Sequence, residues 1–256
     1  MAYLLGIDAG TSGLKAVLFN EGGRVIAISR AEYDLLTPAI NMVELDANEY
    51  WNACRKAISG ILRASKVDPR EIKSLAISSQ GETFIPVDKK GKPLRNAIVW
   101  LDNRSEEESK IIRGGFSVDE VFKVTGQPEV VPTWPATKIL WLKRNEPKVF
   151  KETYKFLLVE DFLIYKLSGI IATEYSVVSS TLMFDIRRER WWDEMLEFIG
   201  IDGGRLPELM PSGKIVGNVT ETASSETGLT RETIVSTGAF DHAAGAVGAY
   251  NIGPRI

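Results

Sequence analysis

Residues 3–32 read YLLGIDAGTSGLKAVLFNEGGRVIAISRAE, three apolar runs separated by two glycine-containing turns. Runs rich in β-branched and apolar residues that are joined by such short turns are typical of neighbouring antiparallel strands. This stretch therefore predicts a three-stranded meander. A helix should follow from about Asp46 to Ser65, because Asp46 and Glu49 form a helix-start pattern and apolar residues then recur on one face.

The next segments indicate how the sheet continues. SLAISSQ (residues 74–80) predicts a buried strand, and FIPVD and NAIVWLD predict two more. Three strands, a helix and a further strand differ from a Rossmann unit, in which a helix joins each pair of neighbouring strands. The order matches a ribonuclease-H-like α/β fold, a mixed sheet flanked by helices. Residues 1–212 should form this domain, and residues 213–256 should begin a truncated second domain of the same type. The boundary falls within the proline- and glycine-containing stretch LPELMPSGKIVGNV.

The composition predicts a globular chain, since 44% of the 256 residues are hydrophobic, 25% are charged and the formal net charge is −3. Without a basic stripe or a Lys/Arg-rich amphipathic helix, we expect no nucleic-acid or membrane partner. No apolar run approaches the ~18 residues of a membrane span. The start MAYLLGIDAG meets an acid before a signal-peptide core could form, so we expect a cytoplasmic protein.

The first candidate site is the turn after the first strand. Asp8 ends that strand, and Gly10, Thr11 and Ser12 follow in a tight turn whose N–H groups can converge on a phosphate. Because like charges repel, Asp8 would act on phosphate through Mg²⁺ and its water shell, while Lys15 compensates the charge. The alternative is an ordinary hairpin in which Asp8 caps the turn.

The second candidate is Asp241, between the strand and the small-residue helix of STGAFDHAAGAVGA. A carboxylate at a helix N-terminus stays ionised and can accept a proton from an attacking hydroxyl, so Asp241 is a candidate general base. The alternative is a plain helix cap. His242, the only histidine, has no partners for a zinc site and is at most a substrate contact.

The third candidate is a polar rim formed by SSQGETF and IVWLDNRS. Carboxylates and amides hydrogen-bond to neighbouring hydroxyls, and an indole packs on the C–H surface of a polyol. These residue types therefore predict a sugar site. The alternative is a core tryptophan followed by a helix start. The rim residues are Gln80, Glu82, Trp100, Asp102 and Arg104.

Seven segments in order, DAGTSGLKAVLF, SSQGETF, IVWLDNRS, VPTWPATKILWL, VEDFLIYKLSG, WWDEML and TGAFDHAAGAVG, resemble the N-terminal portion of the FGGY carbohydrate kinases. The resemblance implies an actin- and Hsp70-like fold with two hinged domains, sugar deep in the cleft and ATP with Mg²⁺ nearer the second domain. It implies that Asp8 acts on the metal and that Asp241 is the catalytic base. It places Gly10, Thr11, Ser12 and Lys15 in the phosphate loop.

The rim differs from that of two well-known branches of the family. Glycerol kinases have N-Q-R-E-T where this chain has S-Q-G-E-T, so Gly81 replaces an arginine and Glu82 is retained. Thr133 replaces a tyrosine, and xylulokinases have a Met-His pair where Gly81 and Glu82 stand. Smaller side chains at two substrate contacts, Gly81 and Thr133, predict a larger pocket and a sugar or sugar alcohol longer than glycerol.

Family members continue beyond the helix after Asp241 with a Gly-Thr-rich phosphate loop and an adenosine-binding glycine motif, which are not present in this sequence. We therefore expect a kinase half that is inactive alone, that needs a C-terminal half as its partner, and whose uncovered sheet face favours a homodimer. Two other functions stay open: a sugar-binding module without catalysis, and an actin-like or chaperone-like ATPase that shares only the fold.

Overall fold

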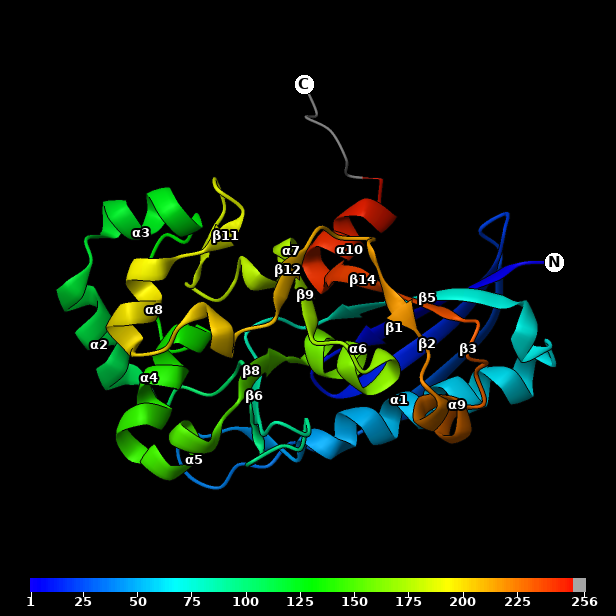
Figure 1. Cartoon of the computed structure of the whole chain (residues 1–256), viewed down its shortest axis with the longest axis horizontal. Coiled ribbons are helices and arrows are strands. Elements are labelled where there is room, and N and C mark those ends of the chain that lie inside the picture. Colours follow the sequence, from blue (N-terminus) through cyan, green and yellow to red (C-terminus); the bar gives the residue numbers. More distant parts are fainter. Residues whose placement is uncertain (251–256) are drawn as a thin grey trace.

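Two apolar cores organise the computed structural model, which describes residues 1–250 (Figure 1). One core lies between a six-stranded sheet and the helices on one of its faces. The other fills a helical lobe, drawn mainly in green and yellow in Figure 1. The predicted α/β class with a mixed sheet and flanking helices is confirmed.

The six-stranded sheet has the order β13-β14-β5-β1-β2-β3. The strands β1, β2 and β3 form the predicted antiparallel meander. β5 pairs in parallel with β1, and β14 pairs in parallel with β5. Because parallel and antiparallel pairs occur together, the sheet is mixed. The strands are β1 (Tyr3–Ala9), β2 (Gly13–Asn20), β3 (Val25–Glu32), β5 (Ile72–Ser79), β13 (Ile215–Asn218) and β14 (Ile234–Phe240).

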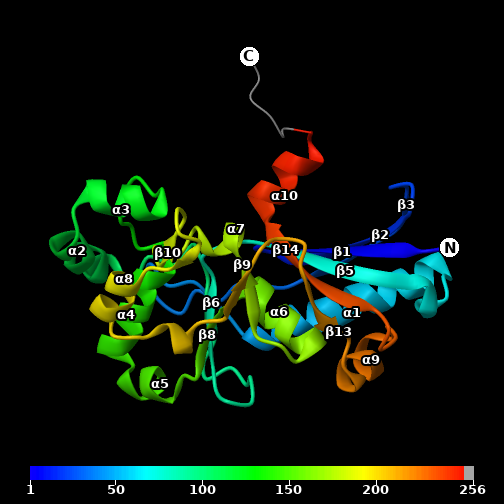
Figure 2. The ribbon, with the colours of Figure 1, turned by 45° about the horizontal axis from the view of Figure 1, so that its top comes forward.

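Three helices cover one face of this sheet: α1 (Ala47–Ser65), α6 (Val159–Ser168) and α9 (Glu221–Thr227) (Figure 2). The Asp46 carboxylate accepts a hydrogen bond from the Asn48 N–H at 2.9 Å and so starts α1 where the sequence predicts. On the opposite face α10 (Asp241–Gly248) contacts the sheet through β14 and β5. Among residues 1–250 no helix has both the length and the apolar character needed to cross a membrane.

The helical lobe adjoins a second sheet of order β4-β7-β6-β8. This sheet consists of β4 (Glu44–Leu45), β6 (Phe84–Val87), β7 (Ala97–Ile98) and β8 (Lys155–Leu158). The lobe consists of α2 (Glu106–Gly115), α3 (Val118–Thr125), α4 (Pro135–Asn145), α5 (Pro147–Glu152) and α8 (Asp193–Ile199). The short elements are η1 (Pro69–Glu71), β9 (Ala172–Glu174), α7 (Tyr175–Val178), β10 (Phe184–Asp185), β11 (Arg190–Trp191), η2 (Gly203–Arg205) and β12 (Glu208–Met210).

The structure corrects the predicted domain boundary at residue 213. Both strands after that residue, β13 and β14, pair within the first sheet, and β14 lies directly beside β5 with Ile234 opposite Ser74. The first part of the proline- and glycine-containing stretch, residues 206–214, contains β12 and connects the helical lobe to the sheet edge, and its last part forms β13. Residues 213–250 thus extend the first sheet and form no separate one. The last residues of the predicted second domain, 251–256, lie outside the described residues.

Candidate functional site

The candidate site lies at the edge of the six-stranded sheet where three parallel strands end. β1 pairs in parallel with β5, and β5 pairs in parallel with β14. Across these strands Asp8 lies opposite Ser78, and Ser78 lies opposite Ala239. The segments that follow the three strands therefore emerge side by side, and each carries one of the predicted groups of site residues. In α/β sheets, ligands bind beyond the carboxyl ends of the strands.

Next to the turn between β1 and β2, a carboxylate in β1 faces a lysine in β2. Asp8 and Lys15 are cross-strand neighbours, with Lys15 Nζ 3.4 Å from Asp8 Oδ2, and their side chains are 46% and 40% exposed. The Gly10 N–H donates to the Gly13 carbonyl at 3.0 Å, and Ser12 is exposed at the tip. The turn is tight, as predicted, and the Asp8 carboxylate faces Lys15.

Hydrogen bonds connect this turn to the predicted sugar rim. The Thr11 hydroxyl donates to Gln80 Oε1 at 3.2 Å and accepts from the Trp100 indole N–H at 2.9 Å. Gln80 Nε2 donates to the Tyr50 hydroxyl at 3.0 Å. Trp100 is half-buried, so part of its surface is open to solvent. Thr11, predicted as part of the phosphate loop, therefore also fixes two residues of the rim.

The turn after β5 is strained. Glu82 has a φ of +55°, which a residue with a side chain rarely adopts, and the Thr83 N–H donates to the Gly81 carbonyl at 2.6 Å across it. Strain of this kind gathers at functional sites. Burial raises the pKa of Glu82; Asp241 adds to the increase and Ser180 opposes it. A carboxyl group that keeps its proton more readily can donate as well as accept a hydrogen bond from a sugar hydroxyl.

Asp241 is the first residue of α10, directly after β14. Phe240 takes the N-cap position, so Asp241 is not the cap residue of this helix. The Asp241 side chain is 32% exposed, and its Oδ1 accepts the N–H of His242 at 2.7 Å. The imidazole of His242 is 85% exposed. Asp241 therefore presents a solvent-accessible carboxylate at the positive end of a helix.

A groove of about 720 Å³ on the open face of the sheet is lined by Asp8, Lys15 and Asp241 together. No three His, Cys, Asp or Glu side chains gather as a metal site within residues 1–250. Mg²⁺ at phosphates usually keeps several waters and takes one or two protein carboxylates, and Asp8 could supply one such carboxylate. A second hollow beside the same turn, about 340 Å³, adds Arg30, a basic residue that sequence reasoning missed.

Asp102 lies apart from this group, and the structure corrects its prediction as a substrate contact. It is fully buried, and its carboxylate accepts hydrogen bonds from the Val43 N–H at 2.6 Å and from Arg104 Nε at 2.9 Å. Arg104 also pairs with Glu44 at 2.7 Å. The Asp102 carboxylate is neutralised by the guanidinium of Arg104, two residues later in the chain. Both side chains therefore stabilise the loop after β7, and neither faces the rim.

Lys138, which the sequence did not indicate as a site residue, stabilises the backbone at Trp100, one of the rim residues. It is fully buried in α4, and its Nζ donates to the carbonyls of Val99 at 2.9 Å and Trp100 at 3.3 Å. Burial lowers the pKa of Lys138 to about 7. A lysine at a buried position of a predicted helix was the available signal. Thr133 is half-buried in the turn before the same helix.

The space beside Gly81 is filled, contrary to the expected enlargement of the pocket. A β-carbon at Gly81 would lie 2.7 Å from Ser180 Oγ and 2.8 Å from Phe240 Cε2. Neither neighbour was singled out from the sequence, because both are far from Gly81 along the chain. The Thr181 carbonyl accepts the Ala136 N–H at 3.2 Å, so this segment also lies beside the start of α4.

Two buried carboxylates hold the end of β14. Glu160 Oε1 accepts the Gly238 N–H at 2.8 Å. Glu174 Oε1 accepts the Ser176 hydroxyl at 2.7 Å, and the Ser176 oxygen accepts the Phe240 N–H at 2.9 Å. Only glycine fits at position 238, where a β-carbon would lie 1.7 Å from a backbone oxygen of β5. The backbone of Gly238 and Phe240, which leads into Asp241, is thus held by hydrogen bonds to Glu160 and Ser176.

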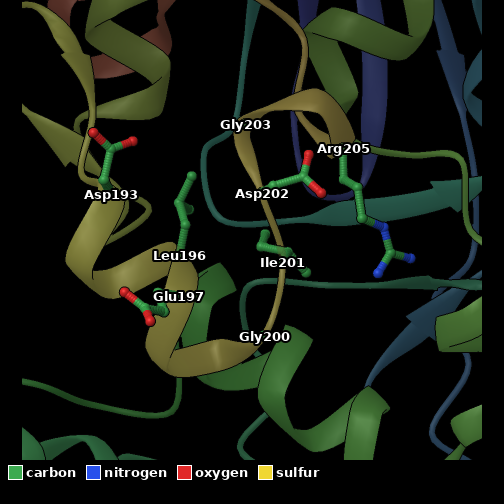
Figure 3. Close-up of a pocket in the computed structure, with 8 residues that line it drawn as sticks. All are labelled: Asp193, Leu196, Glu197, Gly200, Ile201, Asp202, Gly203 and Arg205. Atoms are coloured by element: carbon green, nitrogen blue, oxygen red, sulfur yellow. The ribbon is translucent and has the colours of Figure 1, made fainter.

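Another hollow, of about 610 Å³, lies between α8 and η2 in the helical lobe (Figure 3). It is lined by Asp193, Glu197 and Asp202, and by Arg205, whose guanidinium points away from α8. Arg205 Nη2 donates to the Thr153 carbonyl at 2.8 Å. This hollow lies outside the edge where the strands end, and its acids are surface residues of the lobe.

The sequence matches the N-terminal domain of the FGGY family of carbohydrate kinases over residues 3–248. It is 31% identical over 249 residues to a xylulose kinase of Staphylococcus xylosus, covering 97% of this chain and 51% of that protein. It is 37% identical over 222 residues to a glycerol kinase of Thermococcus onnurineus, covering 84% of this chain and 44% of that protein. The chain spans about half the length of the curated relatives it matches.

The structure agrees with this similarity. The crystal structure of a xyloylose kinase from Brucella ovis superposes with a TM-score of 0.89 at 31% identity, covering 96% of this chain and 50% of that one. The predicted actin- and Hsp70-like fold, which these kinases share, is confirmed. The match also extends through β14 and α10, in agreement with their place in the first sheet. The chain belongs to the FGGY family of carbohydrate kinases.

Proposed function

We propose that this chain binds the sugar and the phosphates in an ATP-dependent kinase that phosphorylates a hydroxyl of a sugar or polyol. One observation carries the proposal: the turn after β1, the turn after β5 and Asp241 all open at one edge of the sheet, and Asp8 and Asp241 line one groove. Family membership and the names of the relatives, xylulose kinase and glycerol kinase, support the same reaction class.

Asp241 is the proposed general base. It accepts the proton of the sugar hydroxyl while that oxygen bonds to the transferred phosphorus and ADP departs. ATP would supply the phosphoryl group, and Mg²⁺ would neutralise the charge that spreads over it. Asp8 would hold the hydrated metal, while Lys15 and the N–H groups of the adjacent turn offset phosphate charge.

The proposed sugar contacts are the Gln80–Glu82 turn, Trp100, Thr133 and His242. Gln80 and Trp100 are held by Thr11, so the groups that orient hydroxyls and pack on C–H surface are already in place. Because the relatives are about twice as long, we further propose that a C-terminal kinase half, in the same polypeptide or in a separate subunit, supplies the adenosine contacts.

The test is Asp241→Asn in the chain joined to a C-terminal FGGY half, with ADP release as the readout. Asparagine keeps the shape but accepts no proton, so kcat should fall by about 10²–10⁴ while sugar affinity changes only a few-fold. The matched control is Asp193→Asn, a 72% exposed acid in the lobe, which should change neither value. Wild-type turnover in Asp241→Asn would refute the assigned mechanism.

The chain alone provides a second arm. Without the adenosine contacts it should release no ADP above background with any sugar. Tight sugar binding by the chain alone, with no turnover after the C-terminal half is added, would instead support a sugar-binding module.

A further inference from the structure

We infer that Gly81 and Phe240 are a matched pair that determines which substrates the site accepts, and that the pair selects an uncharged polyol or ketose whose C–H surface packs on the Phe240 ring. The inference rests on the proposed function and specifies its substrate class. Gly81 does not have the positive φ seen at other glycines of the chain, so its backbone conformation does not require glycine. What requires glycine is space, because a β-carbon would lie 2.8 Å from Phe240 Cε2 and 3.3 Å from Cζ. It would also lie 2.7 Å from Ser180 Oγ, but a terminal hydroxyl can turn aside more easily than an aromatic ring.

The Phe240 ring is fixed between two parts of the site. It directly precedes Asp241, and its backbone N–H is held by Ser176 at 2.9 Å. On the other side the ring packs against Gly81 and lies with its centroid 4.8 Å from that of His242. Phe240 is half-buried, so the residue keeps part of its surface exposed. A rigid aromatic face next to the proposed base suits the C–H side of a sugar carbon.

The charges around the pair favour an uncharged substrate. Asp241 is close enough to raise the pKa of Glu82 beyond the effect of burial, so the rim already carries two acids. Two cationic groups also act on Glu82: Lys138, which is fully buried and donates to two carbonyls, and His242, whose exposed imidazole carries a charge only when it is protonated. A carboxylate on the substrate would therefore meet two acids, and neither of these two groups is both exposed and permanently charged. The hydroxyls of an uncharged sugar could donate hydrogen bonds to Glu82 and Asp241, and its C–H surface could pack on the Phe240 ring.

The test measures sugar binding to the 256-residue chain by ligand-observed NMR, over three- to six-carbon polyols, ketoses and the matching aldonates. Wild type should bind its best uncharged sugar at least about tenfold more tightly than the matching aldonate. Phe240→Ala removes the aromatic ring that packs on the sugar. It should lower that affinity about tenfold, while the binding of larger sugars improves. Gly81→Ala should displace the ring and also change the ranking. Adding Gly81→Ala to Phe240→Ala should cost little further affinity, because the ring that the new methyl group would meet is already absent.

The control is Gly115→Ala, since a β-carbon there would lie 2.4 Å from the ring of Phe198 in the helical lobe. It makes the same kind of glycine–phenylalanine clash away from the site, so it should lower the unfolding midpoint and leave the sugar ranking unchanged. The inference is overturned if Phe240→Ala keeps the wild-type ranking, if the effects of Gly81→Ala and Phe240→Ala simply add, or if wild type prefers the aldonate.

The kinase proposal fails by a different route. A ranking that is insensitive to the pair, together with loss of turnover in Asp241→Asn, contradicts only the pair. A ranking that depends on the pair, together with normal turnover in Asp241→Asn, contradicts only the assigned mechanism. A wild-type chain that binds no sugar of the panel contradicts the pair as selector.

Discussion

Asp161→Asn should make the folded chain more stable at neutral pH and above. Asp161 is 1% exposed in α6, its Oδ2 accepts the Leu158 N–H at 2.7 Å, and its Oδ1 is buried without a partner. Burial raises the pKa of Asp161 from 3.8 to about 7, and Glu174 nearby adds to the increase. Asparagine has nearly the shape of protonated aspartic acid and can accept the same hydrogen bond without ionising.

The sign follows from proton linkage. Between pH 3.8 and about 7 the folded chain keeps a proton at Asp161 that the unfolded chain has lost. The free energy of unfolding of the wild type therefore falls as pH rises through this window, by up to about 1.4 kcal/mol per pH unit. Over the whole window the loss is on the order of 4 kcal/mol. Above it both states are ionised and the loss stays constant.

The assay is urea unfolding of both chains from pH 4 to 8. The two free energies should agree within about 1 kcal/mol near pH 4 and diverge toward pH 8, with the variant more stable. Asp185→Asn is the control of opposite sign. Burial raises the pKa of Asp185, but the N–H groups of Arg188 and Arg187 outweigh burial and lower it overall. That variant should be less stable than wild type at pH 7, with the difference shrinking in acid. Parallel curves for Asp161→Asn and wild type would refute the reasoning.

Three further predictions concern the site and the open face of the sheet. In the completed kinase, Asp8→Asn should raise the Mg²⁺ requirement and lower turnover about tenfold or more, with partial rescue by added metal in a titration; no change in the Mg²⁺ dependence would argue against a metal role. Lys138→Met should flatten the pH dependence of the free energy of unfolding between about pH 7 and 10.5. In this range the unfolded wild type holds a proton that the folded chain lacks, so wild-type stability rises with pH. Urea titrations should show this rise in the wild type and not in the variant. The chain should self-associate in sedimentation experiments through the open sheet face, where Leu4 and Ile28 are 49% and 53% exposed, and Leu4→Lys with Ile28→Lys should weaken this; a strictly monomeric wild type at high concentration would count against it.

The first half of the fold could be predicted because its signals are local. The meander of β1 to β3, the start of α1 at Asp46 and the buried strand β5 depend on apolar periodicity, turn residues and capping, which neighbouring positions determine. The partner of a strand is not local. The pattern of residues 234–240 predicts a strand equally well in either sheet, and only the pairing with β5 shows which sheet it joins. The predicted boundary at 213 failed for that reason.

The candidate site shows the same division. Asp8 lies near the end of a strand and Gln80 and Asp241 each follow one, and the resemblance to a known family placed them in one site. Asp102 was misassigned because an arginine two residues later satisfies it locally. The contact of Phe240 with Gly81 joins positions far apart in the chain, so no window of the sequence contains it.

Two of the buried ionisable groups, Glu160 and Lys138, bind backbone that leads to the proposed site. Glu160 holds β14 just before Asp241, and Lys138 holds the backbone of Trp100 from the other side. Burial raises the pKa of Glu160 and lowers the pKa of Lys138, so each costs stability that an apolar residue would not. Both donate to or accept from backbone groups that end at a proposed substrate contact. Both groups therefore stabilise the backbone that positions the proposed base, Asp241, and the proposed sugar contact Trp100, at the cost of burying an ionisable side chain.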